Sequence, residues 1–313
     1  MSATTITTAP VPFTARDGEN LALHEWPLDD WVDEMGPGAP PPRGVVLLIH
    51  GLGEHAIRYE HVAQQLMDWG FAVRAYDQRG HGDSGGARGT IPDDATLLDD
   101  LAEIIDDTRL RCERLPSAVH ASNPDSESAS PLPLILLGHS LGGLVASRLV
   151  ALNIRPVEGL IMSSPALDAG LGVFQKLLLA VLPRLMPNFC VSNGLDARYL
   201  SHDERVTKAY MADRLVHDRI SARLGKFIAT AGPATVAAAA SWRVPTLLLF
   251  AGDDHLVNPQ GSRDFAKNAA NSRTVKPGTV TVKCFNGMYH ELFNELRPAA
   301  VFDALEAWLD AKF

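Results

Sequence analysis

Cysteine is scarce in this chain of 313 residues, which contains three: Cys112, Cys190 and Cys284. They are far apart in sequence, and none belongs to a C-x-x-C pair or to a Cys/His cluster. A disulfide framework usually has an even number of cysteines, and a zinc site has ligands at short, regular spacings. The sequence therefore predicts neither disulfides nor a metal site.

Long apolar runs are missing as well. No stretch approaches the roughly 18 consecutive apolar residues of a membrane-spanning helix. The first residues, MSATTITTAPVPFTARDG, have neither the basic region nor the apolar core of a signal peptide. We therefore expect a cytoplasmic protein.

Basic residues are in deficit. The chain has 28 lysines and arginines against 37 acids, a formal net charge of −9. Because nucleic-acid binding requires a basic face, this balance argues against DNA or RNA as a partner. With 46% hydrophobic residues the composition is that of a globular protein, and the length fits one large domain or two smaller ones.

Short apolar runs alternate with amphipathic stretches along the chain. This alternation predicts an α/β fold with a mostly parallel sheet covered by helices on both faces. Residues 168–242 break the alternation and are predicted to form a helical insertion, between core segments 1–167 and 243–313. We expect strands or hairpins at 13–26, 45–49, 71–76, 134–137, 157–163, 244–250 and 279–285, and helices at 58–69, 96–115, 141–152 and 298–313.

The stretch LILLGHSLGG, residues 134–143, ends a predicted strand in the pattern G-x-S-x-G. Glycines at this point are also compatible with an ordinary strand-to-helix turn. The alternative is a nucleophile elbow, in which a strained turn exposes a serine oxygen above the sheet. Under that interpretation Ser140 is the nucleophile, and it requires a base.

The partners of such a serine follow it in the order acid, then histidine. His290, just beyond the predicted strand 279–285, fits the place of the base. His255 does not, because it directly follows the candidate acid. The acid is expected at the end of the preceding strand, where Asp253 and Asp254 are adjacent, and spacing alone does not choose between them.

The stretch VVLLIHGLGEH places an H-G-x-G loop after an early strand. Such a loop can aim a backbone N–H at a developing oxyanion. The two donors would be the amides of Leu52 and Leu141. A phosphate-binding loop is excluded because no G-x-x-x-x-G-K or G-x-G-x-x-G pattern follows the strand. A second loop, YDQRGHGDSGG at 76–86, is expected to have a structural role beside the site.

The motifs HGLGEHAIRY, YDQRGHGDS, GHSLGG, DHLV and MYHELFNE occur in this order between residues 50 and 295. Together they resemble the α/β-hydrolase superfamily, and more closely its monoacylglycerol lipase and lysophospholipase branch. The resemblance implies an α/β-hydrolase fold, an eight-stranded, mostly parallel sheet with a helical cap between strands six and seven. It also implies Ser140 as nucleophile, His290 as base and Asp254, matched by D-x-L-V, as acid.

The resemblance further implies a serine ester hydrolase that works through an acyl-enzyme and needs no cofactor. The expected partner is a small lipid or ester, most specifically a monoacylglycerol. Head-group contacts are expected from Glu54, Arg58, His139 and Tyr210. The alternatives are a carboxylesterase for short or aromatic esters, a lysophospholipase, a thioesterase, a proline-type aminopeptidase, a cofactor-free haloperoxidase and, from another class, a non-catalytic binding protein on this scaffold.

The apolar run at 171–187, LGVFQKLLLAVLPRLMP, allows two interpretations. It can pack inward and line an acyl tunnel, or it can make transient contact with a membrane surface. It lacks the basic face typical of a surface-binding helix. Nothing in the sequence indicates an oligomer.

Overall fold

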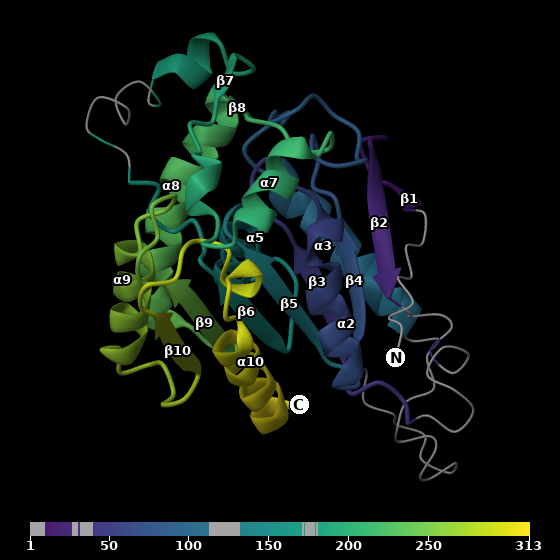
Figure 1. The fold of residues 1–313 in the computed structure, drawn as a ribbon, viewed down its shortest axis with the longest axis vertical. Helices are drawn as coiled ribbons and strands as arrows, with labels where there is room; N and C mark the ends of the chain where they lie inside the picture. The colour runs from purple at the N-terminus through teal and green to yellow at the C-terminus, as the bar shows by residue number, and fades with distance from the viewer. Residues whose placement is uncertain are drawn as a thin grey trace.

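The computed structural model describes residues 10–26, 31, 40–112, 132–170, 172, 179 and 181–313. Its centre is an eight-stranded sheet in the order β1-β2-β4-β3-β5-β6-β9-β10 (Figure 1). The strands are β1 (Val11–Thr14), β2 (Asn20–Trp26), β3 (Val45–Ile49), β4 (Ala72–Tyr76), β5 (Leu134–His139), β6 (Gly159–Ser163), β9 (Thr246–Ala251) and β10 (Val280–Phe285).

The sheet is mostly parallel, as the sequence predicts. β1 and β2 pair antiparallel, as do β2 and β4, and all the other neighbours pair parallel. β3, β4, β5, β6 and β9 are buried at every position, which explains why they read as continuous apolar runs rather than as alternating ones. The carboxyl ends of these strands meet at one edge, where ligands bind in open α/β sheets.

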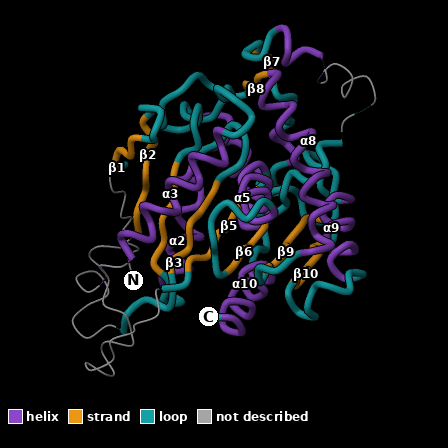
Figure 2. Tube along the Cα trace, turned by 180° about the vertical axis from the view of Figure 1, so that it is seen from behind, coloured by secondary structure: helices purple, strands orange, loops and turns teal. Residues whose placement is uncertain are grey.

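Helices cover both faces (Figures 1 and 2). One core includes side chains from α3 (Thr96–Cys112), α5 (Leu141–Ala151), α8 (Ala222–Ala238) and α9 (Gln260–Ala270). The other includes α2 (Glu60–Asp68) and α10 (Ala299–Lys312). Helix α9 was not among the elements expected from the sequence.

The segment between β6 and β9 contains η2 (Ala197–Tyr199), α7 (Glu204–Ala212), α8, η3 (Ala239–Ser241) and a two-stranded sheet of β7 (Cys190–Ser192) and β8 (Arg219–Ser221). Figure 1 shows β7 and β8 near the top of the molecule and α7 below them, at the upper end of the main sheet. The insertion that the sequence predicts to be helical thus also contains a short two-stranded sheet. β7 and β8 are far apart in sequence, so no local hairpin pattern predicts their pairing.

Helix α8 lies within the range predicted as cap, yet it packs with the core. Leu224, Phe227 and Ile228 are buried in the same cluster as α3 and α5. The boundaries 168 and 242 of a separate cap stay a prediction. Of the apolar run at 171–187, positions 171, 173–178 and 180 lie outside the described residues. No helix in the described part of the chain is long and apolar enough to cross a membrane.

Candidate active site

Ser140 occupies the sharp turn between β5 and α5. Its backbone has φ 52° and ψ −115°, in the left-handed region that residues with side chains rarely adopt. Three hydrogen bonds hold this turn: the Ser140 amide donates to Ser163 O at 3.0 Å, and Ser140 O accepts from the amides of Leu144 and Ala166 at 3.0 Å each. Strain that is fixed in this way is typical of functional positions.

Gly142 is required at this turn because two backbones meet there. A Cβ on Gly142 would collide with the carbonyl oxygen of Ile49, the last residue of β3. The glycine therefore lets α5 begin close against the neighbouring strand. This close approach gives the second glycine of G-x-S-x-G a physical reason.

His290 and Asp254 form a buried pair. Nδ1 of His290 lies 2.7 Å from Oδ2 of Asp254, and the two side chains are 5% and 2% exposed. The other carboxylate oxygen accepts from the amides of Leu256 and Val257 at 2.9 and 3.0 Å. Because Nδ1 is engaged by the carboxylate, Nε2 is the ring nitrogen left for a substrate or a nucleophile.

The neighbouring acid is in a different position. The Asp253 side chain is 56% exposed and lies 3.4 Å from the ring of His255, on the outside of the molecule. The ring of His255 stacks on Tyr199. The structure thus brings Asp254 to His290 and does not bring Asp253 there.

The charges of the pair shift both pKa values. Burial alone would lower the pKa of His290, but the Asp254 carboxylate, by its charge and its hydrogen bond, raises that pKa above 6.5. Burial raises the pKa of Asp254, but the imidazole and the two amides together hold it below its usual value. The pair therefore favours an ionised carboxylate beside a histidine that readily accepts a proton.

The amides of Leu52 and Leu141 both lie at carboxyl ends of adjacent parallel strands. Leu52 follows β3, and Leu141 is the first residue of α5, where helical amides have no partner within the helix. Neither amide donates to any residue in the described part of the chain.

The loop that carries Leu52 is held by its own acid and by the insertion. Oε1 of Glu54 accepts from the Gly51 amide at 2.5 Å. The Gly53 carbonyl accepts from the His217 amide at 2.9 Å, and a Cβ on Gly53 would collide with the His217 carbonyl. Gly53 also has φ +80°, so no other residue fits this contact without strain.

Glu54, Arg58 and Tyr210, which the resemblance implies as head-group residues, lie close together. Nη1 of Arg58 donates to Glu54 at 2.6 Å, and the guanidinium lies 4.8 Å from the centre of the Tyr210 ring. Tyr59 donates to Glu54 at 2.7 Å. Because both oxygens of Glu54 already accept hydrogen bonds, its contacts are those of a residue that positions the loop; substrate contact by these three residues stays a prediction.

His139, also expected to touch substrate, is buried at the end of β5. Its ring lies 4.7 Å from that of His290, and its Nδ1 is 3.3 Å from Ser163 Oγ. Burial and the neighbouring His290 lower the pKa of His139 to about 4, so the ring is neutral at pH 7. These contacts place it beside the base, and its contact with substrate stays a prediction.

The insertion also fixes the loop of His290. The His290 amide donates to Tyr199 O at 3.4 Å, and the Glu291 amide donates to Leu200 O at 2.8 Å. The two neighbouring ring pairs, His202 on Tyr289 and Tyr199 on His255, are stacked. The base is therefore held between the core and the insertion.

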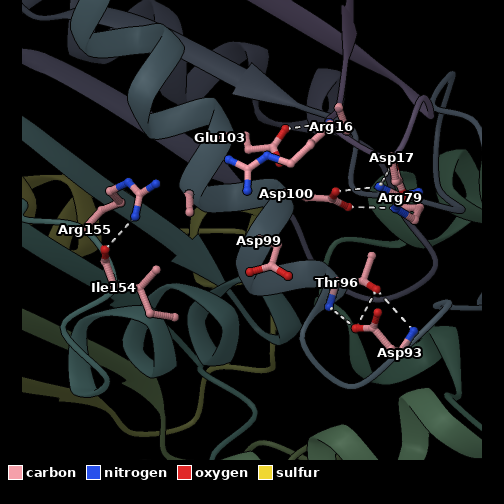
Figure 3. Close-up of a pocket in the computed structure, with 12 residues that line it drawn as sticks. Arg16, Asp17, Arg79, Asp93, Thr96, Asp99, Asp100, Glu103, Ile154 and Arg155 are labelled. Atoms are coloured by element: carbon pink, nitrogen blue, oxygen red, sulfur yellow. Dashed lines mark hydrogen bonds and ion pairs between the residues drawn. The ribbon is translucent and has the colours of Figure 1, made fainter.

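The loop 76–86 has the structural role that the sequence predicts. Asp77 accepts from the amides of Ala56 and Asp83 at 2.8 Å each. Arg79 is buried and forms two-bond pairs with Asp17 and Asp100, as Figure 3 shows. The cavity drawn there, of about 380 Å³, is lined by these pairs and by none of the Ser140, His290 and Asp254 side chains.

Sequence reasoning missed Glu291, Asp213 and His217. Glu291 binds Arg58 with both carboxylate oxygens, and Asp213 pairs with His55 at 2.8 Å. The position of Glu291 directly after the predicted base could have identified it as a candidate site residue. Asp213 and His217 lie in the insertion without any motif, and only the fold brings them to the Leu52 loop.

Comparison with known proteins gives consistent results. The chain is 35% identical over 271 residues to a monoacylglycerol lipase of Mycolicibacterium smegmatis, covering 86% of this chain and 88% of that one. It is 30% identical to a phospholipase of Bacillus subtilis, covering 87% and 97%. A crystal structure of Paleococcus ferrophilus monoacylglycerol lipase superposes with a TM-score of 0.73 at 30% identity, covering 94% of this chain and 99% of that one.

A family model described as serine aminopeptidase, S33 (Hydrolase_4), matches residues 40–297. This match includes the elbow at Ser140, the loop of Leu52 and the pair His290–Asp254. The chain therefore belongs to this serine hydrolase family and has the α/β-hydrolase fold.

Proposed function

We propose that this protein hydrolyses carboxylic esters of single-chain lipids, most specifically monoacylglycerol to glycerol and fatty acid, through an acyl-enzyme on Ser140. The observation that carries the proposal is the strained Ser140 turn at the same sheet edge as the buried His290–Asp254 pair. A serine hydroxyl is a weak nucleophile, and a neighbouring imidazole held by a carboxylate is the usual means of activating it.

In the proposed reaction, Nε2 of His290 takes the proton of the Ser140 hydroxyl as the oxygen attacks the ester carbonyl. Asp254 holds the ring through Nδ1 and stabilises the imidazolium that forms. The amides of Leu52 and Leu141 donate to the oxyanion, and one such donor contributes about 3–4 kcal/mol. His290 then protonates the departing alcohol, and a water molecule repeats the attack on the acyl-enzyme.

The names of the relatives support the substrate class. Two of the three proteins described above are monoacylglycerol lipases, and the third is a phospholipase. A lysophospholipase is therefore the second candidate, since it also cleaves the ester of a single-chain lipid. Because the family model is described as a serine aminopeptidase, an aminoacyl substrate is the third candidate to be tested.

The insertion is proposed to act as a cap that meets lipid. Five large apolar side chains between residues 181 and 191 are exposed, and exposed apolar patches are typical of a membrane or partner contact. They are Val181, Leu185, Met186, Phe189 and Val191. Leu185→Asp should weaken cosedimentation with phosphatidylcholine vesicles. Leu110→Asp, which changes an exposed leucine on α3 outside the insertion, should not. Equal binding of both variants would contradict the contact.

The activity is tested by release of the carboxylic acid from a panel with one acyl group per substrate. The panel is monoacylglycerols of several chain lengths, lysophosphatidylcholine, p-nitrophenyl esters and an aminoacyl anilide. Ser140→Ala should be inactive, while the matched variant Ser241→Ala, at an exposed serine, should keep full activity. If the protein hydrolyses short esters alone, the lipid assignment is replaced by that of a general carboxylesterase. If Ser140→Ala keeps full activity, the mechanism is contradicted.

A further inference from the structure

Glu54, Arg58 and Glu291 form a charge cluster between the loop of Leu52 and the base His290. Arg58 donates from Nη1 and Nη2 to the two oxygens of Glu291 at 2.7 and 2.8 Å, and from Nη1 to Glu54 at 2.6 Å. All three side chains are nearly buried, with 11% of Arg58 exposed and 4% and 3% of the two acids. The cluster has two carboxylates for one guanidinium.

The Glu54 carboxylate is ionised at neutral pH. Burial would raise the pKa of Glu54, but the Arg58 charge, followed by other neighbouring groups, lowers it to about 2. Glu291 accepts three hydrogen bonds, two from Arg58 and one from Asn294 at 2.8 Å. Counted formally, one arginine and two acids give the cluster a charge of −1.

This charge acts on the reacting groups. Glu54 is bonded to the Leu52 loop through the Gly51 amide, and Glu291 directly follows the base His290. The charges of both acids raise the pKa of His290, which places them within electrostatic reach of the reaction. Tyr210 covers the guanidinium from the side of the insertion. Arg58 is therefore already neutralised and cannot serve as a receptor for phosphate.

We infer that Glu291 is a specificity-determining residue that makes this site select esters of neutral alcohols and reject those whose alcohol carries a phosphate. In water-poor surroundings a like charge is repelled much more strongly than in bulk solvent. A glycerol group brings no charge, whereas a phosphate meets a net negative cluster. The inference rests on the proposed ester hydrolysis and decides between its two lipid substrates.

The test compares two substrates that share one acyl chain and differ by a phosphate on the alcohol, 1-decanoylglycerol and 1-decanoylglycerol 3-phosphate, below their critical micelle concentrations. Decanoate release gives kcat/KM for each. For wild type we expect the neutral ester to be preferred by about a hundredfold. Glu291→Gln, which keeps the shape and leaves Arg58 paired one-to-one with Glu54, should reduce this ratio by about tenfold or more, as expected for a charge removed at close range.

Two further variants separate charge from packing. Glu291→Asp keeps the charge, so it should keep the preference even if its overall rate falls. Asp106→Asn removes an acid of α3 that forms an exposed ion pair with Arg155, and it should leave the substrate ratio at its wild-type value. A substrate ratio that is equal in wild type and Glu291→Gln would overturn the inference, as would a loss of preference in Glu291→Asp.

Failure of the proposed function has a different signature. If wild type releases decanoate from neither substrate, ester hydrolysis itself is refuted and the inference falls with it. If both substrates are cleaved equally well, the hydrolase function stands and only the role of Glu291 is overturned. A lower rate in Glu291→Gln with an unchanged ratio would make Glu291 a residue that only positions His290.

Discussion

Arg58 and Glu291 lie 233 residues apart in sequence and form a two-bond ion pair with N–O distances of 2.7 and 2.8 Å. Arg58 follows the loop of Leu52, and Glu291 follows the base His290. The pair therefore joins the two loops whose relative position decides whether an oxyanion donor and a general base can act on one substrate.

Arg58→Met should destabilise the fold strongly, because it leaves Glu54 and Glu291 buried without a counter-charge. Breaking a buried pair by removing one partner costs about 3–5 kcal/mol. Urea unfolding measures the change. The matched variant Arg155→Met removes an arginine paired at 2.7 Å with Asp106, where the two side chains are 34% and 51% exposed. An exposed pair contributes about 0–1 kcal/mol, so similar losses in both variants would contradict the prediction.

Gly53→Ala should reduce kcat by about a hundredfold while the protein stays folded. The new Cβ meets the His217 carbonyl at a backbone φ of +80°, so the loop must move and carry the Leu52 amide away from the oxyanion. Gly194→Ala is the control, because Gly194 has φ +72° with nothing within 4 Å of its Cβ position. Comparable loss of kcat in Gly194→Ala would attribute the effect to backbone strain alone.

Asp254→Asn should reduce kcat by about 10³- to 10⁴-fold, because an amide no longer holds the correct tautomer of His290 or stabilises its cation. Asp253→Asn should remain within about twofold of wild type, since Asp253 contacts His255 at the surface. Steady-state hydrolysis of a p-nitrophenyl ester measures both. Inversion of the two effects would assign the acid to Asp253.

The acid limb of the kcat/KM profile should have its midpoint above pH 6.5. His290 must be neutral to take the proton of Ser140, and Asp254 raises the pKa of His290 above 6.5, so activity rises with pH through that higher value. In Asp254→Asn the pKa of His290 is lowered by burial and raised only by the weaker effects of Glu291 and Glu54. The midpoint of the acid limb should therefore fall. A midpoint unchanged by Asp254→Asn would contradict the coupling.

The same pair should stabilise the fold in a defined pH window. The raised pKa of His290 gives a contribution that is complete below 6.5 and lost as pH rises through the folded-state value. The lowered pKa of Asp254 gives a second contribution to stability, which is present above pH 3.8 and lost as pH falls through the folded-state pKa of Asp254. Thermal unfolding from pH 4 to 9 should show the Tm difference between wild type and His290→Gln to be largest between these limits.

The local elements were predictable because their signals are local. β3 matches the expected range 45–49, and α5 begins directly after Ser140, as the pattern G-x-S-x-G requires. Helix α9 was missed, although it is a regular amphipathic helix. The pairing of β7 with β8 was missed because their residues meet only through the fold.

The sequence by itself determined the α/β alternation, the elbow at Ser140 and the position of His290, since buried strands, tight turns and chain order leave periodic or punctuated patterns. Spacing could not distinguish Asp253 from Asp254, two identical side chains on adjacent residues, and only the D-x-L-V resemblance favoured Asp254. The tertiary structure decided this, because the turn after β9 points Asp254 inward to His290 and leaves Asp253 exposed. It also decided the partners of Arg58, because ion pairs between distant segments depend on the packing of loops.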